Sequence, residues 1–413
     1  MEPDEALSLL KQGAAQIISE SELREKLAAR RSLRIKLGVD PTTADIHLGH
    51  TLVLRKLRQF QDLGHQAVLI IGDFTGMIGD PSGRSATRPQ LTHEEVMNNA
   101  ATYREQAFKI LDPERTETVS NGDWFRKMTF QDVIRLNSRV TLQQMLQRDD
   151  FHERLEKQQP IRAHEIQYPI MQGWDSVMVQ ADVELGGTDQ LFNILIGRDF
   201  QREEGLPQQV VFLLPLLEGL DGVKKMSKSL GNSVGIIERP QEMFGKLMSI
   251  SDELMARYYR LLLERDLPAD AHPAEAKKQL AFEIVQTYHS TKIARETLDR
   301  WNAYFAARRL DEAKLPSLSP SEVPEDIETD NEQAFDPSTI ADPRWRRRSI
   351  VTIVVAAFSQ CFGIEKSRSD VRRLIGQGSV QINNEKITNP KRAPKLQRDD
   401  ILRLDKTHAV RIQ

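Results

Sequence analysis

The sequence predicts an α/β fold: a doubly wound parallel sheet with a helical insertion, followed by an α-helical domain and a small α+β domain. An apolar strand pattern, a helical pattern and a second apolar strand follow one another within residues 33–71. Two further apolar runs, around 177–183 and over 210–217, lie beyond a long helix-forming stretch. Strands that alternate with helices are typical of open parallel sheets.

The first strand, helix and strand are expected to form one βαβ unit. Residues 33–39 are largely apolar and enter a turn at Asp40-Pro41. From Thr51 onward apolar residues recur at helical spacing, and Gly64 ends that helix. Residues 67–71 form a continuous apolar run, as expected for a strand that is buried on both faces of a parallel sheet.

The rest of the chain divides by composition. Residues 92–160 carry helix-forming residues and are predicted to be a helical insertion within a first domain of residues 1–235. Residues 236–310 are predicted to form a helical domain. Residues 311–342, rich in proline, serine and acids, are predicted to be a linker, and residues 343–413 a small basic domain.

Charge is unevenly distributed along the 413 residues, whose net charge is −3. Residues 343–413 contain 16 lysines and arginines against six acids, whereas residues 311–342 contain one lysine and ten acids. A basic module behind an acidic connector favours contact with a polyanion. The alternative is a solvated surface whose charges compensate within the chain.

Composition excludes several classes of protein. With 39% apolar residues, the chain is expected to fold rather than to be disordered. No apolar run approaches the ~20 residues that span a bilayer, and the acidic start lacks a secretory signal. The single cysteine, Cys361, excludes an internal disulfide framework and a multi-cysteine zinc site. We therefore expect a cytoplasmic protein without membrane contact.

The strongest chemical signal is the segment DIHLGH at residues 45–50, placed between a predicted strand and a predicted helix. Open α/β sheets bind nucleotides at such a point. Gly49 lets a flat base approach the backbone, and His47 and His50 can donate hydrogen bonds to phosphate oxygens. The alternative for this motif alone is a pair of ordinary surface histidines.

The second signal is KKMSKS at residues 224–229, with three lysines and two hydroxyls. Lysine suits a leaving polyphosphate because it supplies a point charge with rotatable donors. A charged surface turn is the alternative for this cluster alone, but the combination of the two motifs is far more specific. The sequence contains no P-loop, no G-x-G-x-x-G and no H-E-x-x-H zinc motif.

HLGH and KMSKS resemble the HIGH and KMSKS signatures of class I aminoacyl-tRNA synthetases. GDPSG at 79–83, the pattern Tyr168-x3-Gln172-x2-Asp175 and GGTDQ at 186–190 resemble the tyrosyl-tRNA synthetases of bacteria. Residues 367–383 resemble an S4 RNA-binding domain. The resemblance implies a Rossmann-like catalytic domain, an anticodon-side helical domain, an S4-like tail and a homodimer that uses L-tyrosine, ATP and tRNA(Tyr).

The resemblance also implies that the amino-acid carboxylate joins the α-phosphorus of ATP, with Mg²⁺ as counter-ion and no protein-bound metal. No general base is then required, because a carboxylate is already ionised at pH 7. The catalytic candidates, expected to meet phosphate charge, are His47, His50, Lys225, Lys228 and, as weaker candidates, Thr42, Arg84 and Arg88. The further ATP-binding candidates are Gly38, Asp40, Gly49, Gly187, Asp189, Met226, Ser227 and Ser229. Within that set, Gly187 and Asp189 would hold the ribose.

The tyrosine-binding candidates implied by the resemblance are Lys36, Asp80, Tyr168, Gln172, Asp175 and Gln190. Asp175 would accept a hydrogen bond from the phenol. A site built to bond a hydroxyl rejects the analogue that lacks it, and tyrosyl enzymes are themselves the usual example. Many bacterial tyrosyl enzymes have a second tyrosine where this chain has Lys36, so we expect this lysine to donate to the phenol oxygen.

The basic tail is expected to bind RNA. Residues 370–375 predict a basic helix, and residues 380–387 a hairpin with an Asn-Asn turn. The RNA-binding candidates are Arg368, Arg372, Arg373, Lys386, Lys391 and Arg392. Cations on a helix and a hairpin suit an RNA backbone, whereas a dimer or domain contact is the alternative. The insertion helices, around residues 130–146, are the predicted dimer interface.

Three other functions stay open on the sequence alone. A tryptophanyl enzyme would offer an indole N–H that Asp175 could also accept. An RNA-binding protein could keep a synthetase fold without catalysis, although it would not need intact HLGH and KMSKS motifs. A small-molecule adenylyltransferase could use H-x-G-H but would leave the basic tail unexplained.

Overall fold

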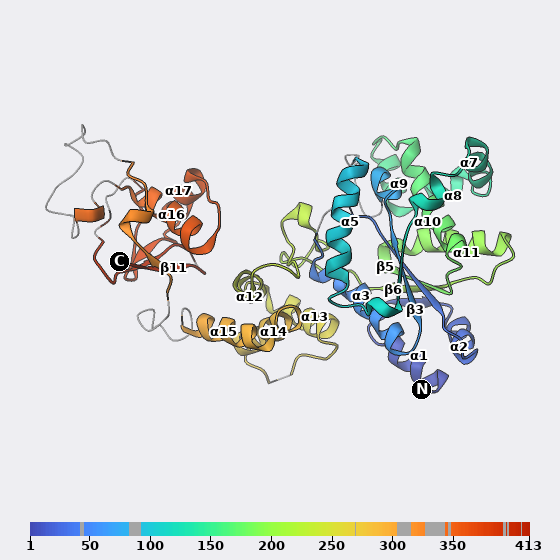
Figure 1. Cartoon of the computed structure of the whole chain (residues 1–413), viewed down its shortest axis with the longest axis horizontal. Helices are drawn as coiled ribbons and strands as arrows, with labels where there is room; N and C mark the ends of the chain where they lie inside the picture. The colour runs from blue at the N-terminus through green and yellow to red at the C-terminus, as the bar shows by residue number, and fades with distance from the viewer. Residues whose placement is uncertain are drawn as a thin grey trace. The chain divides into compact units, whose positions relative to one another are not determined.

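The chain forms two compact units, residues 1–294 and residues 295–413, in a computed structural model (Figure 1). The structure describes residues 1–41, 45–81, 92–268, 270–303, 315–326, 343–345, 348–390, 394, 396–405 and 407–413. The domain boundaries drawn from composition at residues 235 and 310 stay predictions.

A six-stranded sheet forms the centre of the first unit, in the spatial order β1-β6-β5-β2-β3-β4. Its strands are β1 (Gln16–Ile18), β2 (Arg34–Val39), β3 (Gln66–Ile71), β4 (Thr116–Ser120), β5 (Val183–Gly187) and β6 (Val210–Leu214). Strands β2 to β6 are parallel, and β1 pairs antiparallel with β6 at one edge. The predicted α/β class and the first βαβ unit are confirmed.

Helices cover both faces of this sheet. In Figure 1, α5 lies on one side of the strands and α11 on the other. The α-helices that accompany this sheet in the described part of residues 1–235 are α1 (Pro3–Lys11), α2 (Glu20–Ala28), α3 (Leu48–Asp62), α4 (Thr75–Ile78), α5 (His93–Ala107), α6 (Gly122–Phe125), α7 (Phe130–Asn137), α8 (Leu142–Leu146), α9 (Asp149–Glu156), α10 (Ala163–Met178) and α11 (Leu191–Glu203). Three 3₁₀ turns accompany them: η1 (Pro113–Arg115), η2 (Thr188–Gln190) and η3 (Lys228–Leu230).

Two strands of the first unit's sheet were missed by the sequence analysis. β4 lies inside the stretch predicted to be a helical insertion, where it pairs with β3 as an edge strand. Its sequence, TETVS, is polar and half-buried, so it lacks the continuous apolar run of a central strand. β1 has only three residues, too few for a periodic signal. The insertion is therefore helical on both sides of an edge strand.

The predicted helical domain consists, where described, of α12 (Pro240–Met248), α13 (Asp252–Leu262), α14 (Pro273–Tyr288) and α15 (Thr291–Trp301). Each of the first three has a clear start. Proline occupies the first turn of α12 and of α14, and the Ser251 side chain accepts from the Leu254 backbone N–H at the start of α13.

The second unit has a five-stranded sheet in the order β7-β11-β10-β8-β9. Its elements are β7 (Ser317–Leu318), η6 (Pro320–Glu322), η9 (Pro343–Trp345), α16 (Ile350–Phe362), α17 (Arg368–Gly376), β8 (Gln381–Ile382), β9 (Glu385–Lys386), β10 (Ile401–Arg403) and β11 (Ala409–Ile412). Asn383 and Asn384 both have positive φ, 48° and 71°, so the predicted hairpin turn is present. The small α+β fold expected for the tail is confirmed.

Part of the predicted linker belongs to this second unit. β7 pairs in parallel with β11, and Leu318 and Val323 are buried in one core with Trp345 and Ile350. The acidic and proline-rich composition concealed these two apolar anchors. Residues 327–342 lie outside the described part of the chain.

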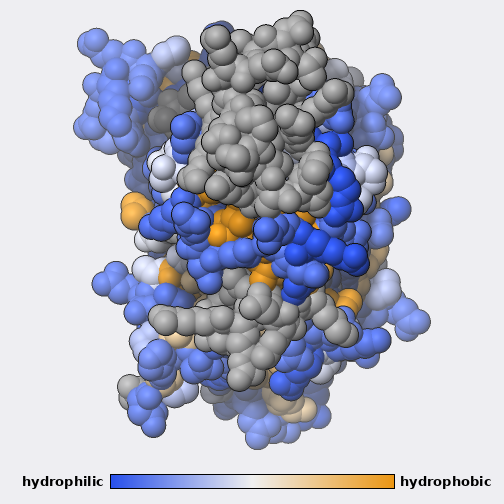
Figure 2. Space-filling model, turned by 90° about the vertical axis from the view of Figure 1, so that its left-hand side faces the viewer, coloured by the Kyte–Doolittle hydropathy of each residue, from blue (hydrophilic) through white to orange (hydrophobic). Residues whose placement is uncertain are grey.

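Described residues on the face seen in Figure 2 are mostly hydrophilic, with isolated apolar ones between them. No helix in the described ranges combines the length and the apolar character needed to cross a bilayer.

Candidate active site

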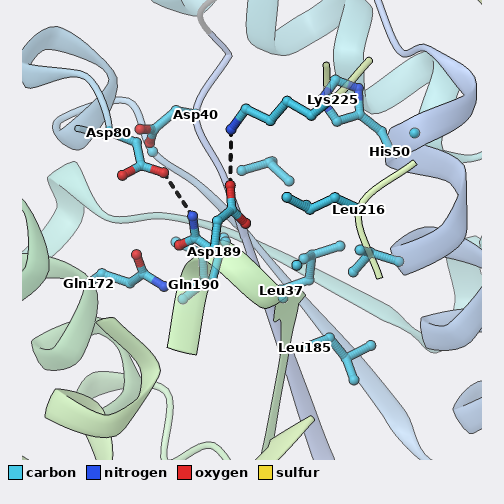
Figure 3. Close-up of a pocket in the computed structure, with 18 of the residues that line it drawn as sticks. Leu37, Asp40, His50, Asp80, Gln172, Leu185, Asp189, Gln190, Leu216 and Lys225 are labelled. Carbon is cyan, nitrogen blue, oxygen red and sulfur yellow. Dashed lines mark hydrogen bonds and ion pairs between the residues drawn. The ribbon is translucent and has the colours of Figure 1, made fainter. Parts of the chain in front are cut away.

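A cavity of about 330 Å³ lies at the carboxyl ends of β2, β3, β5 and β6 (Figure 3). This is the sheet edge at which open α/β folds bind ligands. The predicted ATP- and tyrosine-site residues that line it are Gly38, Asp40, His47, Gly49, His50, Asp80, Tyr168, Gln172, Asp175, Gly187, Asp189, Gln190, Lys225, Met226, Ser227, Lys228 and Ser229. Lys36 does not line it. Thr42, Arg84 and Arg88 lie outside the described residues.

The two histidines stand at the start of α3, with His47 as its N-cap residue. Their rings stack with centroids 3.8 Å apart. Burial lowers the pKa of His47 to about 2 and that of His50 to about 4, and the charges of Lys225 and Lys228 push in the same direction. Both rings are therefore neutral at pH 7. The His50 Nδ1 accepts from the His47 backbone N–H at 3.4 Å, so the His50 Nε2 carries the proton and can donate.

The lack of a side chain at Gly49 leaves room for the His47 ring. A Cβ at this position would lie 3.0 Å from Cε1 and from Nδ1 of His47 and 3.5 Å from the Met226 Cβ. The side-chain space of Gly49 is thus already occupied by the His47 ring.

The KMSKS lysines point into the cavity and are paired there with acids. The Lys225 Nζ lies 3.0 Å from the Asp189 Oδ2, as Figure 3 shows, and Lys228 forms an ion pair with Asp45. Asn232 braces the loop, because its Oδ1 accepts from the Ser227 backbone N–H at 2.8 Å. Each lysine is therefore held by one carboxylate, Asp189 in the cavity lining and Asp45 outside it.

Backbone hydrogen bonds connect the HLGH segment to the residues that follow the KMSKS loop. The Leu48 N–H donates to the Val234 carbonyl at 2.9 Å, and the Ile236 N–H donates to the Ile46 carbonyl at 3.0 Å. At the other end of the loop, the Met226 N–H donates to the Leu217 carbonyl at 2.8 Å. The lysine loop thus leaves and rejoins the fold at fixed points.

Polar side chains from three elements line the opposite half of the cavity. The Tyr168 hydroxyl donates to the Asp40 Oδ2 at 2.8 Å, and the Gln190 Nε2 donates to the Asp80 Oδ2 at 2.8 Å. The Asn193 Nδ2 donates to the Oε1 of Gln172, at 2.9 Å, and to that of Gln190, at 3.2 Å. These bonds fix which end of each amide is a donor.

Asp175 is a buried residue of this half. Its Oδ1 accepts from the Trp124 Nε1 at 3.0 Å and its Oδ2 from the Asn121 Nδ2 at 3.3 Å. Burial raises the pKa of Asp175 to about 7, against the opposing effect of the Lys36 charge. Asn121 and Trp124 were missed because they follow β4, the polar strand that the sequence pattern concealed.

A family model described as tRNA synthetases class I (W and Y) matches residues 28–306. The tyrosine–tRNA ligase of Oleidesulfovibrio alaskensis is 46% identical over 100% of this chain and 99% of its own length. The tyrosine–tRNA ligase of Thermotoga maritima is 44% identical over 100% of this chain and 98% of its own length. The chain belongs to the tyrosine–tRNA ligase family. It is therefore an enzyme, a class I aminoacyl-tRNA synthetase.

Solved structures share the fold of this ligase family. A C-terminally truncated mitochondrial tyrosyl-tRNA synthetase of Aspergillus nidulans superposes with a TM-score of 0.59 at 22% identity, over 74% of this chain and 94% of that one. The tyrosyl-tRNA synthetase of Archaeoglobus fulgidus complexed with L-tyrosine gives 0.59 at 21% identity, over 72% and 99%. The family model covers both tryptophan and tyrosine enzymes, whereas the relatives named above are tyrosine–tRNA ligases. The amino acid is therefore tyrosine.

Lys36 departs from its expected place in this ligase site. Its side chain is fully buried, and its Nζ lies 2.8 Å from the Gln172 carbonyl oxygen, 2.7 Å from the Ser176 Oγ and 2.9 Å from the Glu184 Oε1. Three acceptors thus take up the three ammonium protons. The lysine presents no donor to the cavity, so the structure does not support the expected direct contact with a phenol oxygen.

The four RNA-binding candidates that the structure describes are exposed: Arg368, Arg372 and Arg373 on α17, and Lys386 on β9. Two of them are paired with acids. The Arg373 Nη2 lies 3.2 Å from the Asp370 Oδ1, and the Arg368 Nη2 lies 2.6 Å from the Asp326 Oδ2. Asp326 also accepts from the Ser349 backbone N–H at 2.8 Å, so Arg368 helps to fix the start of α16. Lys391 and Arg392 lie outside the described residues.

Proposed function

We propose that this one cavity carries out tyrosine activation, with ATP at the histidine and lysine side and tyrosine at the Asp175 side. The tyrosine carboxylate attacks the α-phosphorus of ATP, tyrosyl adenylate forms and pyrophosphate leaves. The tyrosyl group then passes to the 3′-terminal adenosine of tRNA(Tyr). The observation that carries the proposal is that both sets of residues line one continuous cavity. The chemistry needs positioning and charge stabilisation rather than a base.

At the ATP side, each group has a task that its surroundings support. His50, neutral with its proton on Nε2, donates to a phosphate oxygen. Lys225 and Lys228 exchange their carboxylate partners for the phosphates, which carry more charge than one carboxylate. Asp189, released from Lys225, accepts from the ribose hydroxyls. Mg²⁺ arrives with ATP as its counter-ion and adds positive charge at the phosphates.

At the tyrosine side, three polar groups surround the place of the ammonium group: Asp80, Tyr168 and Gln172. Gln190 lies beside Asp80 and faces the carboxylate end. Asp175 accepts from the phenol O–H. Because its two oxygens already accept from Trp124 and Asn121, the carboxylate is held in one orientation before tyrosine binds.

The first test replaces His50 in an assay of tyrosine-dependent exchange of pyrophosphate into ATP. His50→Ala is expected to lower kcat about 10-fold, the scale of one neutral hydrogen bond, while the Kd for tyrosine stays unchanged. His50→Gln keeps a side-chain donor and is expected to recover part of the loss. Equal losses in both variants, or a response to amino acids other than tyrosine, would contradict the proposed division of the cavity.

We also propose that the enzyme is a homodimer whose interface includes α7 and α8. Three large apolar side chains on these helices are exposed: Phe130 by 80%, Ile134 by 52% and Leu142 by 57%. Grouped apolar side chains of this kind are typical of protein–protein contacts.

Phe130→Asp is expected to weaken this dimer by about 10-fold to 30-fold, because a carboxylate would have to be desolvated in the interface. Sedimentation equilibrium over a range of concentrations measures the change. Met97→Asp, at an apolar side chain that is 43% exposed on α5, serves as the matched control and is expected to leave the dimer unchanged. A wild-type chain that sediments as a monomer at micromolar concentration contradicts the proposal.

The exposed cations of α17 are proposed to contact the phosphates of tRNA(Tyr). Arg372→Ala is expected to weaken tRNA binding about equally for different sequences and to reduce the slope of log Kd against log salt by about one. Pyrophosphate exchange, which needs no tRNA, is expected to be unaffected. Arg24→Ala, whose side chain is 56% exposed on α2, is the control. An unchanged salt dependence in the Arg372 variant would argue against phosphate contact.

A further inference from the structure

We propose that Lys36 and Glu184 form a buried positioning pair for the tyrosine pocket, which holds Gln172 and the helical turn that carries Asp175. The pair would then contribute to the selection of tyrosine by orienting these two residues, with Lys36 behind the cavity wall and Glu184 part of it. This inference rests on the proposed roles of Gln172 and Asp175 at the two ends of the bound amino acid.

The pair is built into the centre of the sheet. Lys36 on β2 and Glu184 on β5 are direct cross-strand partners, so their side chains leave the same face. Their charged atoms lie 2.9 Å apart, with side-chain exposures of 0% and 1%. Both side chains point toward α10, because the Lys36 Nζ also bonds the Gln172 carbonyl oxygen and the Ser176 hydroxyl.

Glu184 gathers four donors onto one carboxylate. Its Oε1 accepts from Lys36 and, at 3.1 Å, from the Gln172 Nε2. Its Oε2 accepts from the Ser176 Oγ at 2.9 Å and from the Gln209 Nε2 at 2.6 Å. Gln172 is thus fixed twice, through its backbone by Lys36 and through its side chain by Glu184.

The same network reaches Asp175 through the geometry of α10. Gln172, Asp175 and Ser176 are spaced i, i+3 and i+4, so they lie on one face of the helix. The groups that act on the Asp175 carboxylate come from several elements: Lys36 from β2, Glu184 from β5, Trp124 from α6 and Asn121 before α6. Burial is the main cause of the raised pKa of Asp175, while Lys36 lowers this pKa and Glu184 raises it.

Stability alone does not account for the pair. Replacing a buried ion pair with well-packed apolar residues is often neutral or stabilising, because both charges must leave water. Val68, the neighbour of Lys36 on the other side, is itself a buried apolar residue. The presence of a lysine and a glutamate at these buried sheet positions is better explained by their hydrogen bonds to Gln172 and Ser176, which they hold in place.

The test compares Lys36→Met with Glu184→Gln in pyrophosphate exchange as a function of pH. The profile of kcat/KM for tyrosine reports Asp175 in the free enzyme. At low pH this profile is expected to fall as Asp175 becomes protonated. We expect the pH of this acid limb to rise by roughly 0.5 to 1 unit in Lys36→Met, which removes a positive charge, and to decrease in Glu184→Gln, which removes a negative one. The KM for tyrosine is expected to rise roughly 10-fold in Lys36→Met, with the KM for ATP unchanged. Phenylalanine, which lacks the phenol, is expected to show no such limb.

Lys56→Met is the matched control for loss of a buried lysine. The Lys56 Nζ is held by the carbonyl oxygens of Leu10 and Gln12 and by the Gln59 Oε1, away from the cavity lining. This variant is expected to lower stability without changing the KM for tyrosine. Shifts of the acid limb in the same direction in the Lys36 and Glu184 variants, or an equal effect of Lys56→Met, overturn the proposal.

The double variant Lys36→Met/Glu184→Met keeps the proposal testable if Lys36→Met alone fails to fold, because it leaves no unpaired charge. It is expected to fold and still to show a raised KM for tyrosine. A wild-type KM and wild-type discrimination against phenylalanine in this variant overturn the positioning role. If Asp175→Asn also leaves discrimination unchanged, the proposed pocket assignment fails as well, so the two failures are distinguishable.

Discussion

Lys228→Ala is expected to slow the formation of tyrosyl adenylate by about 100-fold to 1,000-fold, the effect of removing one preorganised donor from a developing charge. Lys228 lines the cavity and is paired with Asp45, so its ammonium group is already aimed at the space proposed for pyrophosphate. Single-turnover kinetics without tRNA measure this step directly. The Kd for tyrosine is expected to stay within about two-fold, because the lysine is on the ATP side.

Lys224→Ala provides the matched control. Lys224 is in the same loop, but it is exposed and does not line the cavity. Its removal is expected to leave the rate unchanged. Equal losses in the two variants would mean that the loop acts through its overall positive charge and not through a specific contact of Lys228.

Asp175→Asn is expected to lower kcat/KM for tyrosine by about 100-fold and to leave that for phenylalanine nearly unchanged. An asparagine has one acceptor oxygen, whereas Trp124 and Asn121 both donate to the present carboxylate. The new NH₂ group would therefore face a donor or the phenol O–H. Pyrophosphate exchange with each amino acid in turn gives the ratio.

Asp182→Asn is the matched control for a buried aspartate. Asp182 is 5% exposed and accepts from the Arg34 backbone N–H at 3.0 Å, outside the cavity lining. Its variant is expected to be less stable but equally selective. A selectivity for tyrosine that survives Asp175→Asn would contradict the phenol assignment.

Site residues that belong to short sequence motifs could be predicted from the sequence. Residues whose role depends on contacts with distant parts of the chain could not. HLGH, KMSKS and the Tyr168, Gln172 and Asp175 pattern are short segments with distinctive spacing, and the structure brings them to one cavity. The pairing of Lys36 with Glu184 depends on β5 lying next to β2, and no local pattern determines that strand order. A lysine within an apolar strand was the visible signal, but its partner lies far away in the sequence.

Because the strand β4 was not predicted, two residues of the site were not predicted either. β4 lies at the edge of the sheet, where a polar and half-buried sequence is tolerated. Such a sequence has no hydrophobic periodicity from which a strand could be predicted. Asn121 and Trp124 follow directly after β4. The two donors that orient Asp175 were therefore included in the predicted helical insertion without a role of their own.

The backbone bonds that join Ile46 and Leu48 to Val234 and Ile236 bear on the energetics of ATP binding. A loop tethered at both ends samples fewer conformations than a free one, so less entropy is lost when it becomes ordered. More of the attraction between the lysines and the phosphates then remains available to stabilise the transition state. Because one tether is the first turn of α3, the histidines and the lysine loop share a common anchor, which fixes the two halves of the proposed phosphate site relative to each other.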